Sequence, residues 1–496
     1  MKAIHDSVLS RCALCLVVLA IRIGFSTCVQ AQVSLTQLSE DTFTDTPSQH
    51  DTEVEPGTFS YGSTIVSAFQ VARIFGGGGA DVGFATSTDG GQTWTNGYLP
   101  GITIYQGGTN SAASDAAVAY DALHGIWLIS TLPIAANNSV AVSRSTDGIH
   151  WGNPVAVTGS ASADKNWIVC DNTSTSPYYG HCYAEWDNPA DGDLVRMSTS
   201  TDGGQTWGPA LATAGQDFGI GGVPVVQPKG TVVVPILGFR GYVIAFISTN
   251  GGKSWTKAVN VASFINHSED GGLRSDGLPS SAIDGAGKVY VIWSDCRFRK
   301  KCSSNDIVYS TSTTGTKWSA VKRVPIDAVA STVDHFITGA AILPGTEGAK
   351  AQIALAYYFY PVSNCNSGCS LNVGFIQSST GGATWTTAET LAGPMELTWL
   401  PDTFSGTMVA DYISVGWAGG RAFPVFALAQ AKTGSLFDEA IYTTASGQAM
   451  STPLTEPMSA EGDVAVPGAH SDHGPMEYLD QEHEIPISGK RPPQSQ

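Results

Sequence analysis

The chain has 496 residues, of which 42% are hydrophobic and only 14% are charged, and its formal net charge is −18. Its 12 Trp, 16 Tyr and 18 Phe can bury a large apolar core, which excludes simple disorder. The excess negative charge repels phosphate and no long run of Lys and Arg offsets it, so nucleic acid is excluded as a partner.

The N-terminal segment, residues 1–31, predicts a secretory signal peptide. An apolar run from Cys12 to Ile21 follows a basic N-terminus, and Val29-Gln30-Ala31 has the small-residue pattern of a cleavage site. Arg22 interrupts the run, and no later stretch reaches the roughly eighteen apolar residues that a membrane-spanning helix needs. We therefore expect an exported protein, extracellular or periplasmic, without a membrane span.

One short motif recurs along the chain. The octapeptide Ser-Thr-Asp-Gly-Gly-Gln-Thr-Trp occupies 87–94 and 200–207, and weaker copies occupy 145–151, 248–255, 312–318 and 378–385. Asp or Asn bonds the backbone two residues on, Gly accepts positive φ and the hydroxyls close the loop, so each copy predicts a hairpin turn. Because strand-like alternation precedes each copy, we expect it to join the third and fourth strands of a four-stranded unit.

These octapeptides resemble the Asp-box, or BNR repeat, of the sialidase-like β-propellers, over most of 32–445. The resemblance implies an all-β propeller of four-stranded blades with Asp-box turns. In that superfamily the boxes lie on the face away from the active site, so we assign all six copies here a structural role.

A second period predicts the number of blades. Innermost strands are expected to open near residues 51, 115, 164, 221, 278, 334 and 411, which favours seven blades. The sialidases that the chain resembles have six, so six is the alternative. The seventh unit has no box, and we expect Val33 to Phe43 to supply its outer strand and close the ring.

Six cysteines follow the signal segment as local pairs: Cys170 with Cys182, Cys296 with Cys302, and Cys365 with Cys369. Such pairs predict disulfides that staple loops in an oxidising compartment. A zinc site would need Cys-x2-Cys or a His at ligand spacing, and none of the three pairs has either.

Residues 446–496 differ from the rest of the chain. They hold eight acidic and two basic residues, net −6, with scattered Pro and Gly. We interpret them as a solvated, disordered acidic tail. The tail contains His470, His473 and His483, which we do not assign to a metal.

Basic residues gather in one sector of the loop face that is expected to surround the channel mouth. They lie in the loops of the fourth and fifth units: Arg240, Arg274, Arg297 and Arg299. A guanidinium donates two parallel hydrogen bonds to a carboxylate or sulfate, so these arginines are candidates for binding an acidic sugar. The predicted Cys296–Cys302 disulfide would clamp the loop that carries two of them.

Carboxylates are expected opposite the arginines. Candidates open the inner strands or lie in the third unit's loop: Asp115, Asp164, Asp334, Asp411, Glu185 and Asp187. Aromatic side chains accompany them: Trp186, Tyr358, Tyr360, Trp399 and Tyr412. Such a pocket would bind an acidic sugar and protonate its leaving group.

Structural alternatives exist for the same residues. Asp at the start of an inner strand commonly bonds backbone N–H groups. Arg297 and Arg299 can pair with Asp295 and Asp306 on the surface. A ring of axial carboxylates is also a candidate calcium site, and no other cofactor is expected.

The family resemblance implies particular roles. Sialidases use three arginines on the substrate carboxylate, a Tyr nucleophile assisted by Glu, and an Asp acid/base. Their first arginine lies in Arg-Ile-Pro, whereas this chain has Arg73-Ile74-Phe75, which we expect in a hairpin loop. By resemblance, the second and third arginines are Arg274 and Arg297, the nucleophile is Tyr412 or Tyr358, and the acid is Asp115 or Asp164, with Glu185 a further catalytic candidate.

The sequence therefore favours a secreted glycoside hydrolase of the exo-α-sialidase type that acts on extracellular glycans or glycoconjugates. A non-catalytic propeller that binds glycan or protein is the first alternative. A hydrolase of neutral polysaccharides with paired carboxylates is the second. Oligomeric state is not predicted.

Overall fold

The computed structural model describes residues 33–134, 139–157 and 162–451. Within these ranges the chain forms strands, turns and six short 3-10 helices, so the all-β prediction is confirmed. None of the described helices has the length and apolar character to cross a membrane. The expected signal peptide lies outside the described residues, as do residues 452–496 of the expected tail.

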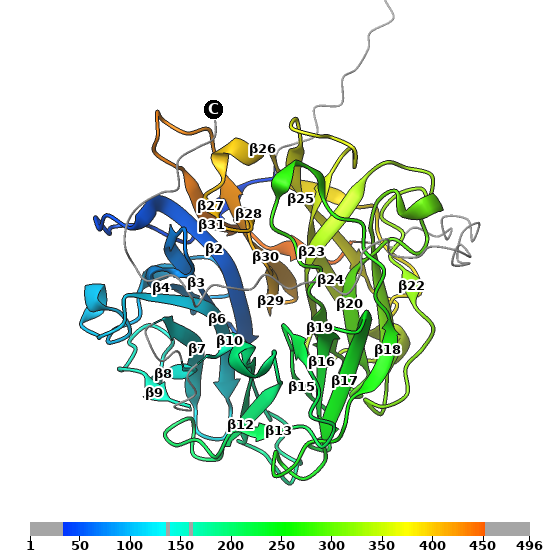
Figure 1. Ribbon diagram of the computed structural model, residues 1–496. Helices are drawn as coiled ribbons and strands as arrows, with labels where there is room; N and C mark the ends of the chain where they lie inside the picture. Colours follow the sequence, from blue (N-terminus) through cyan, green and yellow to red (C-terminus); the bar gives the residue numbers. More distant parts are fainter. Residues whose placement is uncertain (1–32, 135–138, 158–161, 452–496) are drawn as a thin grey trace, which may run out of the picture. The chain divides into compact units, whose positions relative to one another are not determined.

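The strands form successive antiparallel groups along the chain (Figure 1). The first groups are β2 (Ser48–Tyr61), β3 (Thr64–Ile74), β4 (Gly79–Ser87) and β5 (Thr95–Tyr98); β6 (Ala112–Asp121), β7 (Ile126–Ile134), β8 (Ala141–Ser145) and β9 (Val155–Ala156); and β10 (Asp164–Cys170), β11 (Cys182–Asp187), β12 (Arg196–Ser200) and β13 (Leu211–Ala212). The next contains β14 (Gly219–Ile220) and β15 (Val225–Val226), both paired with β16 (Val232–Gly238), then β17 (Tyr242–Ser248) and β18 (Val259–Ser263).

The later groups repeat this pattern. They are β19 (Ser280–Ile283), β20 (Val289–Asp295), β21 (Asp306–Ser312) and β22 (Lys322–Arg323); β23 (Asp334–Ile342), β24 (Ile353–Tyr360), β25 (Ser370–Ser378) and β26 (Glu389–Glu396); and β29 (Ser414–Ala418), β30 (Arg421–Ala429) and β31 (Glu439–Thr444). A small hairpin, β27 (Asp402–Thr403) and β28 (Gly406–Thr407), precedes the last group.

The first strand of each group contacts the first strand of the next. The contacts run from β2 to β6, β10, β15, β19, β23 and β29, and from β29 back to β2. Hydrogen bonding does not close any sheet on itself. Apolar residues fill the space between neighbouring groups, as where Val66 and Val82 share a cluster with Val118 and Ile129.

The N-terminal strand completes the last group. β1 (Leu35–Gln37) pairs antiparallel with β31, as expected for a strand between Val33 and Phe43. At the other end, β32 (Gln448–Ala449) pairs with β30, so strand pairing continues beyond residue 445, where the sequence placed the start of the tail.

The recurrent octapeptides connect the third and fourth strands of their groups, as predicted. After β4, Asp89 Oδ1 accepts hydrogen bonds from the N–H groups of Gln92 (3.0 Å) and Thr93 (2.9 Å). Ser87 Oγ accepts one from the N–H of Gly91 (2.8 Å). The turns at residues 200–206 and 248–254 repeat this pattern of side chains capping the backbone.

These turns also join neighbouring groups. At Gly91, φ is +86° and an added Cβ would lie 2.3 Å from the ring of Phe423 on β30. Equivalent glycines pack on the preceding group: Gly204 on Leu128, Gly252 on Thr199 and Gly382 on Tyr309. The first turn therefore packs against the last group, in agreement with the contacts of the first strands.

Several first strands share a bulge near their start. Register shifts in β2, β6, β10 and β23 coincide with positive φ at Glu55 (58°), Asp115 (46°), Lys165 (44°) and Ile337 (47°). A bulge re-aims the side chain that it carries. The sequence predicts inner strands that open with Asp51, Asp115 and Asp164. In β2 there are two register shifts, the first at Asp51 (φ 55°) and the second at Glu55, and in β10 the bulge residue is Lys165, which follows Asp164.

Candidate functional site

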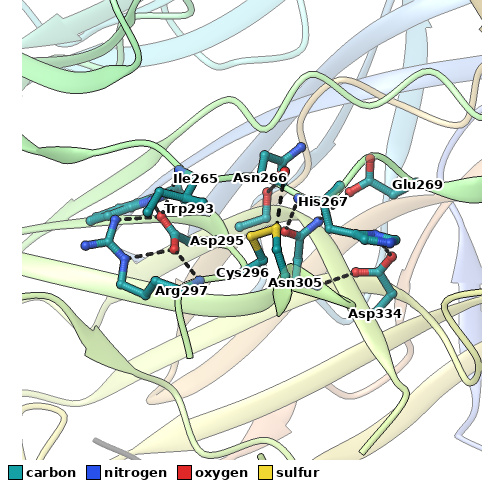
Figure 2. The surroundings of a disulfide bond; sticks show 12 residues. Ile265, Asn266, His267, Glu269, Trp293, Asp295, Cys296, Arg297, Asn305 and Asp334 are labelled. Carbon is teal, nitrogen blue, oxygen red and sulfur yellow. Dashed lines mark hydrogen bonds and ion pairs between the residues drawn. A yellow bond between two sulfur atoms is a disulfide. The ribbon is translucent and has the colours of Figure 1, made fainter. Parts of the chain in front are cut away.

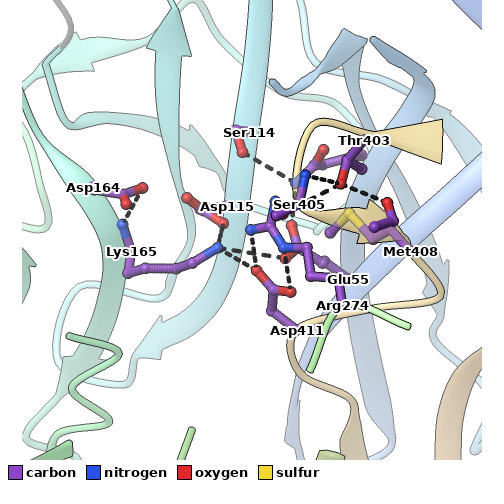
Figure 3. Close-up of polar contacts among 12 residues, drawn as sticks. Glu55, Ser114, Asp115, Asp164, Lys165, Arg274, Thr403, Ser405, Met408 and Asp411 are labelled. Atoms are coloured by element: carbon purple, nitrogen blue, oxygen red, sulfur yellow. Dashed lines mark hydrogen bonds and ion pairs between the residues drawn. The ribbon is translucent and has the colours of Figure 1, made fainter. Parts of the chain in front are cut away.

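Bulge residues of three consecutive groups meet at one ammonium group (Figure 3). Lys165 Nζ lies 2.6 Å from Asp411 Oδ2, 3.4 Å from Asp115 Oδ1 and 3.6 Å from Glu55 Oε1. The three carboxylate side chains are fully buried and that of Lys165 is 3% exposed. We call Glu55, Asp115, Lys165, Arg274 and Asp411 the Lys165 cluster.

Arg274 pairs with the same carboxylate as Lys165. Its Nε donates to Asp411 Oδ1 at 2.9 Å and its Nη2 to Oδ2 at 2.5 Å (Figure 3). The backbone N–H of Arg274 donates to the carbonyl of Thr407 at 2.8 Å, which fixes this connecting segment beside the β27–β28 hairpin. Arg274 therefore already binds a carboxylate of its own chain.

The surroundings separate the pKa values of two cluster carboxyls. Burial raises the pKa of Glu55 well above its usual range, despite the opposing effect of Lys165. Burial alone would also raise the pKa of Asp411, but Arg274 and Lys165 outweigh it and hold that pKa well below the usual range. The cluster thus shifts the pKa values of Glu55 and Asp411 in opposite directions.

A cavity of about 430 Å³ is lined by the first strands and includes Lys165, Trp167 and Tyr412. Trp167 packs edge-on against Tyr412, with ring centroids 5.3 Å apart. The Tyr412 hydroxyl donates to the carbonyl of Ala116 at 3.4 Å, and burial raises its pKa well above the usual range. Tyr412 thus stands between Asp411 and the segment that carries Asp115.

The other predicted carboxylates of this sector are structural neighbours of the cluster. Asp164 accepts a hydrogen bond from the N–H of Lys165 at 2.9 Å and lies opposite Asp187 in the β10–β11 pairing. Glu185 is fully buried, and neither of its carboxyl oxygens has a hydrogen-bond partner among the described residues. Burial raises the pKa of Glu185 well above its usual range. Its carboxyl group lies against Gly222, where an added Cβ would approach to 2.5 Å.

All three predicted disulfides are present, joining Cys170 to Cys182, Cys296 to Cys302 and Cys365 to Cys369. The Cys296–Cys302 bridge lies beside the segment that carries His267 (Figure 2). The N–H of Cys296 donates to the carbonyl of Ile265 at 2.8 Å. This loop therefore supports the connection between β18 and β19.

The four arginines do not converge on one receptor as the sequence suggested. Arg297 Nη2 contacts Asp295 Oδ2 at 2.7 Å (Figure 2), and Arg299 is fully buried with Nη2 2.5 Å from Asp306 Oδ1. Both arginines thus pair with the carboxylates of the structural alternative, although the Arg299–Asp306 pair is buried and not on the surface as expected. Arg240 lies in the β16–β17 turn, where it is exposed to solvent.

Asp334 orients a histidine that the sequence did not single out (Figure 2). Its Oδ2 accepts a hydrogen bond from His267 Nδ1 at 3.0 Å, and its Oδ1 accepts one from the N–H of Asn305 at 2.6 Å. The Asn305 side chain in turn bonds both the N–H and the carbonyl of His267. The hydrogen bond to Asp334 raises the pKa of His267.

Arg73 lies in β3 and is fully buried, so its expected place in a hairpin loop is wrong. Its guanidinium is satisfied inside the protein, since Nη1 donates to the carbonyl of Gly78 at 2.7 Å and Nε contacts Met408 Sδ at 3.2 Å. The strand can therefore continue through this charged residue.

Most of the aromatic residues that were predicted to line the sugar pocket belong to the core. Trp186, Tyr358 and Tyr360 are fully buried, and the Tyr358 hydroxyl donates to the carbonyl of Ala427 at 2.7 Å. Trp399 is partly buried and packs against the apolar cluster of the last groups. Only Tyr412 among the predicted aromatic residues lines the cavity.

One group of possible metal ligands occurs in the described part of the chain: Asp306, Asp327 and His335. Arg299 and Arg323 both pair with Asp306 and Asp327, so the carboxylates already face positive charge. The same argument applies to calcium at Asp115 and Asp411, which face Lys165. We assign no metal to either place.

Glu55 and Lys165 are the site residues that sequence reasoning missed. A charged residue in an otherwise apolar strand was the available signal, as in Glu53-Val54-Glu55 and beside Asp164. Their position in the cluster depends on bulges that no local sequence pattern predicts.

Comparison with known proteins gives weak similarities. No protein-family model and no curated protein matches the chain. The chain is similar to a Hadza microbial sialidase, at 16% identity over 62% of this chain and 64% of that one, with a TM-score of 0.42. This match thus spans less than two thirds of that sialidase.

Two further structures show similarity of the same order. A protein of unknown function from Dyadobacter fermentans matches at 16% identity over 70% of this chain and 98% of that one, with a TM-score of 0.44. A variant of the NanB sialidase from Streptococcus pneumoniae matches at 14% identity over 83% and 70%, with a TM-score of 0.41.

Proposed function

We propose that this protein is an exported, seven-bladed Asp-box β-propeller that hydrolyses extracellular glycans at the Lys165 cluster. The closed sequence of contacts between first strands supports the seven blades, as does the packing of the recurrent turns on neighbouring groups. Three disulfides support export to an oxidising compartment.

One observation carries the proposed activity: two carboxyls with opposite pKa shifts face the same ammonium group. Glu55 lies 3.6 Å and Asp411 2.6 Å from Lys165 Nζ. Pairs of carboxyls whose surroundings separate their pKa values supply the acid and the anion of glycoside hydrolysis. In this proposal Glu55 protonates the leaving oxygen as the glycosidic C–O bond breaks, and Asp411 or Asp115 stabilises the positive charge that develops on the sugar. A water molecule then adds to the anomeric carbon and returns a proton to Glu55.

The neighbouring cavity suits a sugar. Its volume of about 430 Å³ lies in the range of small-molecule sites. Trp167 and Tyr412 supply apolar surface, and hydroxyl groups such as those of Ser60, Thr338 and Ser414 line the remainder. Lys165 lies in this lining, which connects the cavity to the cluster.

The pairing of Arg274 favours a neutral glycan over a sialoside. A sialic acid carboxylate would have to displace Asp411, which binds Arg274 through two hydrogen bonds. Arg297 and Arg299 pair with other carboxylates. We therefore favour the paired-carboxylate hydrolase over the exo-α-sialidase type.

A non-catalytic glycan-binding propeller is the second candidate. The observation in its favour is burial, because the cluster carboxylates are inaccessible and form the kind of network that also holds strands together. In this case the Lys165 cluster would be structural and the exposed loops would bind the ligand.

The test is hydrolysis of fluorogenic substrates by the full protein, with a panel of neutral glycosides beside an α-sialoside. Release from a neutral glycoside supports the proposal. Release from the sialoside alone would overturn the preference for a neutral glycan. No release by folded protein, together with binding on a glycan array, would overturn hydrolysis in favour of the second candidate.

A further inference from the structure

A second hollow, distinct from the cavity of the Lys165 cluster, lies beside the β16–β17 turn. Its volume is about 610 Å³. The turn and the adjoining segments supply its main side chains: Asp217, Phe218, Phe239, Arg240, Tyr242 and Lys257. We call it the Arg240 groove.

Arg240 differs from the other arginines that the structure describes. Each of the others has a hydrogen bond or an ion pair, with a carboxylate or a backbone carbonyl, as Arg144 has with Gly203. Among the described residues Arg240 has no hydrogen-bond or ion-pair partner, and its side chain is exposed. A guanidinium with free donors at a concave surface is suited to bind an anionic planar group.

Aromatic side chains flank this guanidinium. Phe218 is 40% exposed and Tyr242 is 39% exposed, so both rings are accessible to a ligand. Tyr242 and Ile244 point to the same face of β17, and Asn260 lies opposite Ile244 on β18. The groove therefore combines apolar side chains with the amide of Asn260.

The charge of the groove contrasts with that of the whole chain. Lys257 adds a second exposed cation to Arg240. The lining carboxylate is Asp217, whose Oδ2 already accepts hydrogen bonds from the N–H of Ala258 (2.8 Å) and the Thr213 hydroxyl (2.6 Å). Two cations against one engaged carboxylate make the groove positive on a chain of net charge −18.

We propose that the Arg240 groove binds a uronic acid unit of an acidic polysaccharide. The sugar carboxylate pairs with Arg240 through two parallel hydrogen bonds, with Lys257 as the second cation. The apolar face of the sugar ring packs on Tyr242 and Phe218. This site is separate from the proposed hydrolysis and does not depend on it.

The test measures binding of polygalacturonate oligosaccharides to the full protein by isothermal titration calorimetry. Dextran oligosaccharides serve as the neutral probe and heparin oligosaccharides as the sulfated probe. The variants are Arg240→Ala and Tyr242→Ala, with Lys350→Ala as a control at an exposed cation outside the groove. Because all three side chains are exposed, the variants should fold like the unmodified protein. An unchanged midpoint of thermal unfolding checks this.

Arg240→Ala and Tyr242→Ala are each expected to raise the Kd for polygalacturonate at least about tenfold, and Lys350→Ala to leave it unchanged. Equal affinity of the variants and the unmodified protein, or no binding at all, would overturn the site. Tighter binding of heparin or of dextran would overturn the uronate assignment. Because binding is measured without turnover, a failed hydrolysis assay would leave this result unaffected.

Discussion

Lys165 and Asp411 are 246 residues apart in the sequence, yet Lys165 Nζ donates a hydrogen bond to Asp411 Oδ2 at 2.6 Å. The pair joins the start of β10 to the segment before β29. Arg274 approaches the same carboxylate from a third segment. Buried charges of this kind are stable only together, because each compensates the lost hydration of the others.

Replacing Lys165 tests this mutual dependence. In Lys165→Met, three buried carboxyls lose their common ammonium, and we expect the free energy of unfolding to fall by about 3–5 kcal/mol. Lys350→Met, at an exposed position, should change it by no more than about 0.5 kcal/mol. Urea unfolding measures both. Equal stability of the two variants would show that the cluster contributes little.

Substitutions at two adjacent glycines distinguish the cost of backbone strain from the cost of overpacking. Gly90 and Gly91 both have positive φ, but an added Cβ meets nothing within 4 Å at Gly90 and meets Phe423 at 2.3 Å from Gly91. Gly90→Ala should cost about 1–2 kcal/mol for the left-handed conformation alone. Gly91→Ala should cost about 1–3 kcal/mol more because of overpacking. Identical thermal shifts would contradict the packing of this turn on β30.

Glu185 predicts a pH dependence of stability. Burial raises its pKa well above the ordinary value of 4.5 for a glutamic acid, so the folded state retains a proton that the unfolded state releases. Stability must therefore fall as pH rises from about 4.5 towards the folded-state pKa. Glu185→Gln removes this contribution. The free energy of unfolding of the variant, relative to that of the unmodified protein, should therefore increase between pH 4.5 and 8. Parallel curves would contradict the buried, unpartnered carboxyl group.

His267 gives a second prediction for the pH dependence of stability. The hydrogen bond to Asp334 raises its pKa above 6.5, so its stabilisation is complete below that value and is lost as pH rises through the folded-state pKa. His267→Gln should cost about 1–3 kcal/mol at pH 5.5 and less at pH 8.5. His150→Gln, whose side chain is 86% exposed, is the control and should have little effect at either pH. A cost for His267→Gln that does not change with pH would rule out the ionic hydrogen bond.

The fold was accessible from the sequence because its signals are local. The turn motif has a fixed chemistry of Ser, Asp and Gly, and the cysteine pairs are close in sequence. The pairing of β1 with β31 could be predicted because the last unit has no turn motif and therefore lacks an outer strand of its own. Arg73 was misplaced because its burial depends on acceptors at Gly78 and Met408, and the latter comes from a remote part of the chain.

The site was less accessible because it depends on contacts between groups. Asp115, Asp411 and Arg274 were identified as candidates, but Lys165, which pairs with both carboxylates, was not. The bulges at Glu55 and Lys165 decide which side chains point inward. A shift of one residue in the register would turn different side chains towards the site. For the arginines of the fifth group the sequence offered both a ligand and the carboxylates of Asp295 and Asp306, and only the folded geometry shows that the carboxylates are the partners.

The most direct test of the proposed function replaces the acid. Glu55→Gln keeps the size of the side chain but removes its transferable proton, whereas Glu439→Gln makes the same change at a buried glutamic acid outside the Lys165 cluster. Hydrolysis of the best neutral glycoside should fall at least about a hundredfold in Glu55→Gln and persist in Glu439→Gln, with both variants folded. Unchanged hydrolysis in Glu55→Gln would contradict the assignment of Glu55 as the acid and of the Lys165 cluster as the catalytic site.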